Sequence, residues 1–127
     1  MPKRVSPQEA KGLIDQGWVY VDVRTPEEYA AGHPEGAYNV PIGPELVGAI
    51  ESLFPARDAK IVVGCQAGGR SLRALGLLEA AGYTNVVDQR AGWGGNGSEA
   101  GWGASGLPSE TTAQPGRSWR EIAAKRG

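Results

Sequence analysis

Short apolar runs alternate with amphipathic stretches along the 127 residues of the chain. Residues 18–23 are apolar at almost every position, which is typical of a strand buried on both faces. Residues 61–63 and 85–88 read as further short strands, and residues 37–40 as an extended piece closed by a proline. Strand and helix patterns alternate throughout. The sequence therefore predicts an α/β fold with a mostly parallel central sheet flanked by helices on both faces.

Helix starts are marked clearly in the sequence. Ser6-Pro-Gln-Glu9 and Thr25-Pro-Glu-Glu28 each place a hydroxyl N-cap before proline and a glutamate three residues on, which is a capping box. The helices that follow are expected to end near Gln16 and Gly32, and a third is expected over residues 45–53. After residue 70 a fourth helix is predicted to bury Leu72, Leu75, Leu78 and Ala81, with Leu77 beside them and Gly82 as its stop.

Residues 1–108 are expected to form one domain, in which a glycine- and tryptophan-rich segment, 91–106, lies over the fold as a covering loop. Residues 109–127 read as a connector and a short basic tail, and a helix over residues 118–126 fits the pattern of that tail. A chain of this length buries about two-thirds of the surface that it exposes when unfolded. One hydrophobic core is therefore enough for a chain of this length, and no second core is expected.

The formal net charge of −1 gives no support to a nucleic-acid partner or to an acidic membrane surface. No run approaches the ~18 apolar residues of a membrane span, and the N-terminus carries no signal-peptide pattern. We therefore expect a cytoplasmic protein. A single cysteine excludes an internal disulfide, and a single histidine argues against a Cys/His metal site.

That cysteine, Cys65, follows a predicted buried strand and precedes a Gly-Gly-Arg-Ser helix entry. Backbone amides and the positive end of a helix converge at such a turn and favour an anion. A free thiol is only about 3% thiolate at pH 7. A helix dipole would lower its pKa by about one unit, and the convergent amides together with the Arg70 guanidinium by about one more, which would make thiolate a major form. The competing interpretation is an inert, small core residue.

Three other motifs compete with this interpretation. Residues 92–97 satisfy G-x-G-x-x-G, but no apolar helix follows. Residues 64–71 match a phosphate loop except that Arg70 replaces the lysine, a poor exchange where a compact charge is needed. Cysteine phosphatases place five residues between cysteine and arginine, whereas four separate Cys65 from Arg70. A smaller ring of amides suits a smaller anion than phosphate.

Several segments together resemble the rhodanese-like domain family. They are Asp22-Val-Arg-Thr-Pro-Glu-Glu-Tyr29, Gly32-His33 with Gly36-Ala37, Asn39-Val-Pro41, Cys65-x4-Arg70-Ser71, Ala81-Gly-Tyr-Thr-Asn-Val86 and Gly92-Trp93, in order over roughly residues 4 to 108. The resemblance implies an α/β sheet and a sulfurtransferase without a metal or organic cofactor. Sulfane sulfur would pass from a small donor such as thiosulfate to cyanide or a thiol.

Within this resemblance, Cys65 would carry the sulfur as a persulfide. The cradle around it would be Gln66, Ala67, Gly68, Gly69, Arg70 and Ser71. The alternative is a sulfur-carrier or docking module that serves a protein acceptor and turns over small donors poorly. The uncharged Gln66 and Ala67 leave thiosulfate open as the donor, and Gly64, where the family often has an aromatic residue, is expected to loosen the loop.

Five more residues have a supporting or a purely structural interpretation. Asp22 either orders the loop or pairs with Arg24, and Arg24 is expected to pair with Glu27 or Glu28. For His33 we expect a structural hydrogen bond rather than proton transfer. Trp93 either walls the pocket or covers the core, and Arg73 either attracts an anionic donor or lies on a solvated helix face.

Overall fold

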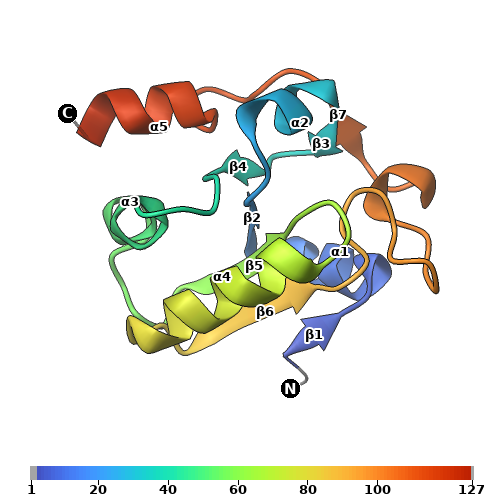
Figure 1. Cartoon of the computed structure of the whole chain (residues 1–127), viewed down its shortest axis with the longest axis horizontal. Helices are drawn as coiled ribbons and strands as arrows, with labels where there is room; N and C mark the ends of the chain where they lie inside the picture. The colour runs from blue at the N-terminus through green and yellow to red at the C-terminus, as the bar shows by residue number, and fades with distance from the viewer. Residues whose placement is uncertain (1–2, 127) are drawn as a thin grey trace.

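The computed structural model describes residues 3–126. Its centre is a five-stranded sheet in the order β1-β6-β5-β2-β4, and every neighbouring pair is parallel (Figure 1). The strands are β1 (Arg4–Val5), β2 (Val19–Asp22), β4 (Tyr38–Asn39), β5 (Lys60–Gly64) and β6 (Asn85–Gln89). The predicted α/β class is confirmed.

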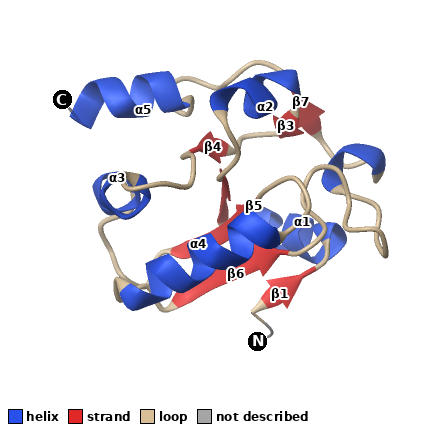
Figure 2. Cartoon of the chain, in the orientation of Figure 1, coloured by secondary structure: helices blue, strands red, loops and turns tan. Residues whose placement is uncertain are grey.

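Helices connect these strands and cover the sheet, with α4 in front of it and α1 behind it (Figures 1 and 2). Both predicted capping boxes form: the Ser6 and Thr25 hydroxyls each accept the amide three residues on. The helices are α1 (Pro7–Asp15), α2 (Pro26–Ala31), α3 (Leu46–Leu53), α4 (Gly69–Ala80) and α5 (Trp119–Arg126), and the covering loop contains the 3-10 turn η1 (Trp102–Ala104).

Alternation along the strands divides the core between the two faces of the sheet. Ile61 and Val63 of β5 pack in one cluster with residues of α3, α4 and α5. Val62, between them, packs in the other cluster with Val87 and with Trp102 from the covering loop. Both faces of β5 are therefore buried, and its carboxyl end is held rigidly where Cys65 begins the next loop.

The predicted buried face of α4 is partly wrong. Leu72 and Leu77 are 44% and 40% exposed, whereas the helix buries Ser71, Ala74, Leu75 and Leu78. The helix begins at Gly69, earlier than expected, and it leans on β5 and β6 through a face centred on Ala74 and Leu78. A polar residue, Ser71, therefore occupies a core position next to the cysteine.

Three short strands have no counterpart in the sequence pattern. Two-residue strands show no periodicity, so neither β1 nor the antiparallel pair β3 (His33–Pro34) and β7 (Ser109–Glu110) was expected. This pair ties the C-terminal segment to the domain. The tail then ends in α5, whose Ile122 is buried in the core beside α3. The predicted boundary at residue 108 stays a prediction.

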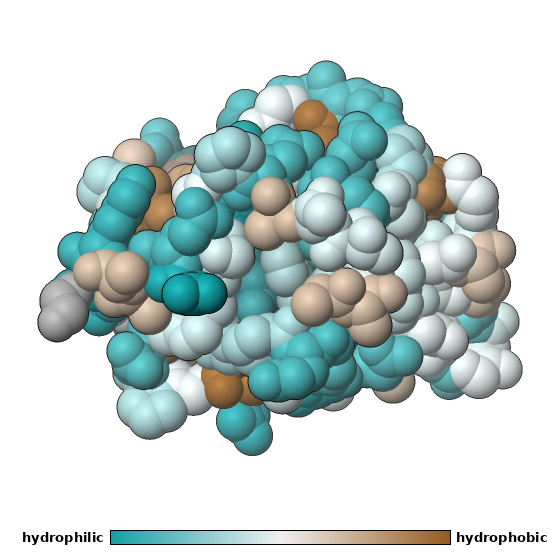
Figure 3. Space-filling model, turned by 90° about the horizontal axis from the view of Figure 1, so that it is seen from above, coloured by the Kyte–Doolittle hydropathy of each residue, from teal (hydrophilic) through white to brown (hydrophobic). Residues whose placement is uncertain are grey.

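Apolar residues on the surface shown in Figure 3 are scattered among hydrophilic ones. Within residues 3–126, no helix has the length and apolar character needed to cross a membrane.

Candidate active site

Cys65 lies directly after β5, at the carboxyl end of the sheet, where ligands bind in open α/β sheets. Its Sγ accepts a hydrogen bond from the Gly68 amide, with an N–S distance of 3.0 Å. Gly68 has φ +102°, and an added Cβ atom would lie 2.3 Å from the Arg90 carbonyl oxygen, so the loop requires glycine there. The cysteine is 2% exposed, at the base of the loop rather than on its rim.

Two opposing effects act on the Cys65 thiol. Burial alone raises its pKa, but hydrogen bonds from the Ser71 hydroxyl and from the amides of Ser71, Gly68 and Ala67 lower it, and the net pKa is below the ordinary value. The Gly68 amide reaches the sulfur because the chain turns into α4 immediately after the loop. The cradle of six residues expected around the sulfur stays a prediction.

The covering loop holds the cysteine loop from the other side. The Trp93 amide donates to the Cys65 carbonyl oxygen at 2.8 Å, and the Gly94 amide donates to the Gln66 carbonyl oxygen at 2.9 Å. Gln89 at the end of β6 accepts the amides of residues 91 and 92 through its side-chain oxygen. The segment predicted as a cover is thus bonded directly to the backbone of the candidate site.

Gly64 does not loosen the loop, contrary to expectation. A Cβ atom at this position would lie 1.8 Å from the Tyr20 hydroxyl oxygen, so the buried tyrosine occupies the space of the missing side chain. The same hydroxyl accepts a hydrogen bond from the Gln89 side chain at 3.3 Å. Close approach of β2 to β5, rather than flexibility, accounts for this glycine.

Arg70, in the first turn of α4, does not lie free beside the sulfur. Its guanidinium donates to both carboxylate oxygens of Glu28 in α2, at 2.8 and 2.9 Å. Hydrogen bonding from Arg70 lowers the pKa of Glu28 to about 2. Arg70 therefore joins the start of α4 to α2, and a carboxylate balances much of its charge.

Arg24 is buried and joins three parts of the site through its side-chain contacts. The expected pairing of Arg24 with Glu27 or Glu28 is wrong. The guanidinium pairs with Asp22, with 2.7 Å between Nη2 and Oδ2. It also donates to the Gly32 carbonyl oxygen and to the Gln66 side chain, at 2.6 and 3.2 Å. The strand turns after Asp22 and directs Arg24 inward, which buries both charges as a pair.

The comparison with known families is decisive. Residues 6–95 match the family model described as Rhodanese-like domain. The chain belongs to the rhodanese-like domain family.

Individual relatives agree with this membership. The chain is 38% identical over 120 residues to Thiosulfate sulfurtransferase 16, chloroplastic, of Arabidopsis thaliana. This alignment covers 87% of this chain and 94% of that protein. The structure of Human Single Domain Sulfurtranferase TSTD1 superposes with a TM-score of 0.64 at 31% identity, over 73% of this chain and 93% of that one. The rhodanese-like domain of the Alr3790 protein from Anabaena sp. gives a TM-score of 0.74 at 26% identity, over 88% and 81%. The chain is an enzyme of the sulfurtransferase class.

Three other expected site residues of this rhodanese-like domain differ in burial and in contacts. His33 is fully buried, stacks on Tyr29 with 3.6 Å between ring centroids, and places Nδ1 2.7 Å from the Tyr29 carbonyl oxygen. Trp93 is partly buried and packs against the core, with the Arg24 guanidinium 5.3 Å from its ring centroid. Arg73 is exposed on α4.

Sequence reasoning missed three charged residues of the site: Glu28, Asp88 and Arg4. Glu28 was expected to complete a capping box and to be one of two possible partners of Arg24, but not to pair with Arg70. Asp88 follows buried residues near the carboxyl end of β6, as Asp22 does on β2, so its position in the sequence pattern could have indicated a site residue. Arg4 has no such signal, because only the folded sheet brings β1 next to β6.

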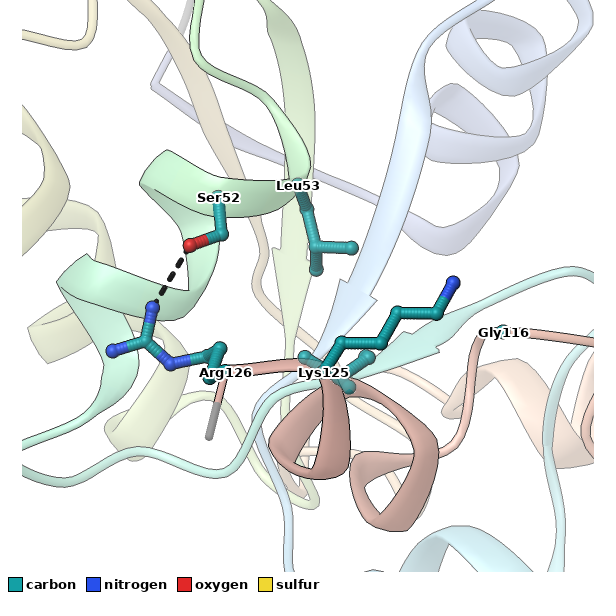
Figure 4. Close-up of a pocket in the computed structure, with 6 residues that line it drawn as sticks. Ser52, Leu53, Gly116, Lys125 and Arg126 are labelled. Atoms are coloured by element: carbon teal, nitrogen blue, oxygen red, sulfur yellow. Dashed lines mark hydrogen bonds between the residues drawn. The ribbon is translucent and has the colours of Figure 1, made fainter.

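A cavity of about 510 Å³ lies elsewhere in the rhodanese-like domain, between α3 and α5 (Figure 4). Arg126 at its edge donates to the Ser52 hydroxyl at 2.9 Å, and the Lys125 ammonium extends away from that pair. No residue of the cysteine loop lines it. Among residues 3–126, no group of three or more metal-ligating side chains gathers around a common point. The chemistry of Cys65, not cavity size, locates the candidate site.

Proposed function

We propose that this rhodanese-like domain transfers sulfane sulfur through a persulfide on Cys65. The observation that supports the proposal best is the Gly68 amide on Sγ, together with the lowered pKa of the thiol. A thiolate is the nucleophilic form of cysteine, and the amides that stabilise it also suit the anionic outer sulfur of a persulfide.

The reaction has two balanced steps. The Cys65 thiolate attacks the outer sulfur of a donor such as thiosulfate. A sulfur–sulfur bond forms to Sγ, and the donor's own bond breaks with its electron pair leaving on sulfite. An acceptor thiolate or cyanide then attacks the outer sulfur of the persulfide, and the electron pair of that bond returns to Cys65 as thiolate.

The position of the thiol bears on the donor. Because Cys65 is 2% exposed at the base of the loop, a slim donor fits better than a bulky one. The loop residues Gln66 and Ala67 carry no charge, and Arg70 is already paired with Glu28. An anionic donor such as thiosulfate therefore meets less uncompensated positive charge at this site than it would if the Arg70 guanidinium were unpaired.

This charge balance supports a second candidate function, a sulfur carrier that serves a protein acceptor and turns over small donors slowly. Both functions use the same persulfide, so they differ only in turnover. Steady-state assay with thiosulfate and cyanide separates them. Rapid turnover that is lost in Cys65→Ser supports the first function. A stable persulfide with little turnover supports the second.

The persulfide itself is tested by intact mass spectrometry after incubation with thiosulfate. We expect the mass of one sulfur atom on the wild-type protein, removed by dithiothreitol, and none on Cys65→Ser. Because the chain has a single cysteine, the added mass is assigned without digestion. The proposal is contradicted if the mass of the wild-type protein stays unchanged both after incubation with thiosulfate and after incubation with a persulfide donor. The cytoplasmic location expected from the sequence stays a prediction.

A further inference from the structure

Gly68 connects the sulfur to the N-terminal strand of the sheet. Its amide donates to Sγ of Cys65 at 3.0 Å, and its carbonyl oxygen accepts Nη2 of Arg4 at 3.2 Å. Nε of Arg4 is in turn 2.6 Å from Oδ2 of Asp88, which is fully buried. A continuous series of contacts therefore runs from Asp88 through Arg4 and Gly68 to the sulfur.

The sheet places Arg4 for this contact. β1 pairs in parallel with β6 so that Arg4 lies opposite Asp88. Two backbone hydrogen bonds hold the strand there: the Asp88 amide donates to the Lys3 carbonyl oxygen at 2.7 Å, and the Arg90 amide donates to that of Val5 at 3.0 Å. The ion pair through Nε then sets the direction of the Arg4 side chain, so that Nη2 reaches the cysteine loop.

Gly68 needs support from outside its own loop. Its φ of +102° is accessible to glycine, but glycine also has more alternative backbone conformations than any other residue, so the residue type alone does not hold this one. Gly68 is also the N-cap of α4, where it has no side chain to bond the first turn of the helix. Contacts with its carbonyl group therefore decide how well its amide stays directed at the sulfur.

A carbonyl oxygen accepts two hydrogen bonds, and Arg4 supplies one of the two for Gly68. The Leu72 amide supplies the other at 3.2 Å, as the first bond of α4. The Ser71 hydroxyl lies 3.3 Å from the same oxygen, but its single hydrogen has a shorter contact with the Asp88 carboxylate. Arg4 is thus the side chain that anchors this carbonyl group to the sheet.

We propose that Arg4 is a positioning residue for sulfur transfer: by holding the carbonyl group of Gly68, its guanidinium keeps the Gly68 amide directed at the sulfur of Cys65. Arg4 acts through Gly68 and not on the sulfur itself. The inference rests on the proposed function, because a well-directed amide stabilises both the thiolate and the anionic outer sulfur of a persulfide. The N-terminal strand, 64 residues before Gly68, becomes part of the site.

Two measurements follow the Gly68 amide and the thiol without any sulfur donor. Nitrogen-15 NMR records the amide proton of Gly68, at a pH where Cys65 is fully ionised. Ultraviolet absorbance against pH records thiolate, as the difference from Cys65→Ser. In Arg4→Met we expect the amide proton to move upfield, because its hydrogen bond weakens. The midpoint of thiolate formation should rise by about half a pH unit to one unit.

Kinetics should agree with the titration. Below the midpoint, a rise of half a unit to one unit reduces the thiolate fraction about three- to tenfold. Persulfide formation with saturating thiosulfate should slow in Arg4→Met by the same factor. The thiosulfate concentration that gives half the maximal rate should stay unchanged, because Arg4 contacts the loop backbone. A loss of stability alone would leave the folded protein with the wild-type midpoint.

Arg4→Lys separates contact from charge. The Arg4 side chain is 41% exposed, so solvent screens its charge, and the effect is expected to come from direct contact. Lysine keeps the charge, but it has one nitrogen where arginine uses Nε for Asp88 and Nη2 for Gly68. Arg4→Lys should therefore keep most of the rise in the midpoint.

Two further variants complete the set. Arg4→Met leaves a buried carboxylate unpaired, which destabilises a fold, and the double variant Arg4→Met/Asp88→Asn removes both charges and should show the same rise. The matched control is Lys3→Met, which removes the neighbouring ion pair with Glu79 of α4. It should change neither the Gly68 signal nor the thiolate midpoint.

The inference is overturned if Arg4→Met and the double variant keep the wild-type midpoint and Gly68 signal. It is equally overturned if Arg4→Lys restores the wild-type midpoint, since charge alone would then explain the effect, or if Lys3→Met shifts the midpoint as much as Arg4→Met. Sulfur transfer is judged separately. A persulfide on the wild type with unchanged midpoints in the variants would retain the proposed function and refute the role of Arg4. Raised midpoints in the variants without a persulfide on the wild type would refute the proposed function and retain the link from Arg4 to the sulfur.

Discussion

Replacing Glu28 with glutamine removes one charge from the ion pair that joins α2 to the start of α4. The side-chain oxygen of glutamine still accepts the Thr25 amide, and the backbone amide of residue 28 still donates to the Thr25 hydroxyl, so the capping box and the helix start are retained. What is lost is the charged, bidentate contact with Arg70 across the cysteine loop.

The magnitude follows from the pKa of Glu28. A value of about 2 in place of the ordinary 4.5 corresponds to about 3 kcal/mol, at about 1.4 kcal/mol for each pH unit. The two side chains are 36% and 32% exposed, and solvent screening at such a pair reduces the contribution to about 1 kcal/mol. Because the folded-state pKa is depressed, this stability is fully present above pH 4.5 and disappears as the pH falls toward 2.

Urea unfolding at a series of pH values tests this reasoning. We expect Glu28→Gln to lower the free energy of unfolding by about 1 kcal/mol at pH 7 and to match the wild type near pH 2. Glu27→Gln, an exposed neighbour on the same helix, should change the stability little at either pH. If Glu28→Gln lowers the free energy of unfolding by the same amount at every pH, the ion-pair explanation is refuted, and packing or capping is the cause.

Three further predictions concern the cysteine loop. Gly64→Ala should lower the free energy of unfolding by about 1–3 kcal/mol in urea, because the new methyl group would overlap the Tyr20 hydroxyl; unchanged stability would show that the tyrosine moves aside. The thiolate absorbance of Cys65 should have its midpoint below the ~8.5 of a free thiol, and sulfur transfer should fall as the pH drops below that midpoint; a midpoint at or above the free value contradicts this. Gly68→Ala should slow persulfide formation in the mass assay at least about tenfold, because the new Cβ atom would overlap the Arg90 carbonyl oxygen and move the amide of residue 68 away from the sulfur. The control is Gly97→Ala, because Gly97 has a positive φ like Gly68 but open space around it. If persulfide formation slows equally in this control, backbone strain alone explains the effect.

Much of the fold was predictable because its signals are local. The capping boxes at Ser6 and Thr25 define helix starts through contacts three residues apart. Continuous apolar runs are enough to indicate buried parallel strands. The position of Cys65 between such a strand and a helix start, a matter of a few residues, indicated a turn rich in amides.

The rest depended on which elements the fold brings together. Glu28 and Arg70 are 42 residues apart, and Arg4 and Asp88 are 84 apart, so no local pattern selects these partners over other charges of the chain. The same limit applies to α4: helical periodicity allows more than one buried face, and contact with the sheet selected the one that contains Ser71. The sequence by itself determined most of the helices and strands and the place of the single cysteine between a buried strand and a helix start. The tertiary structure alone decided which charges surround the sulfur, because such contacts exist only once distant segments of the chain pack against each other.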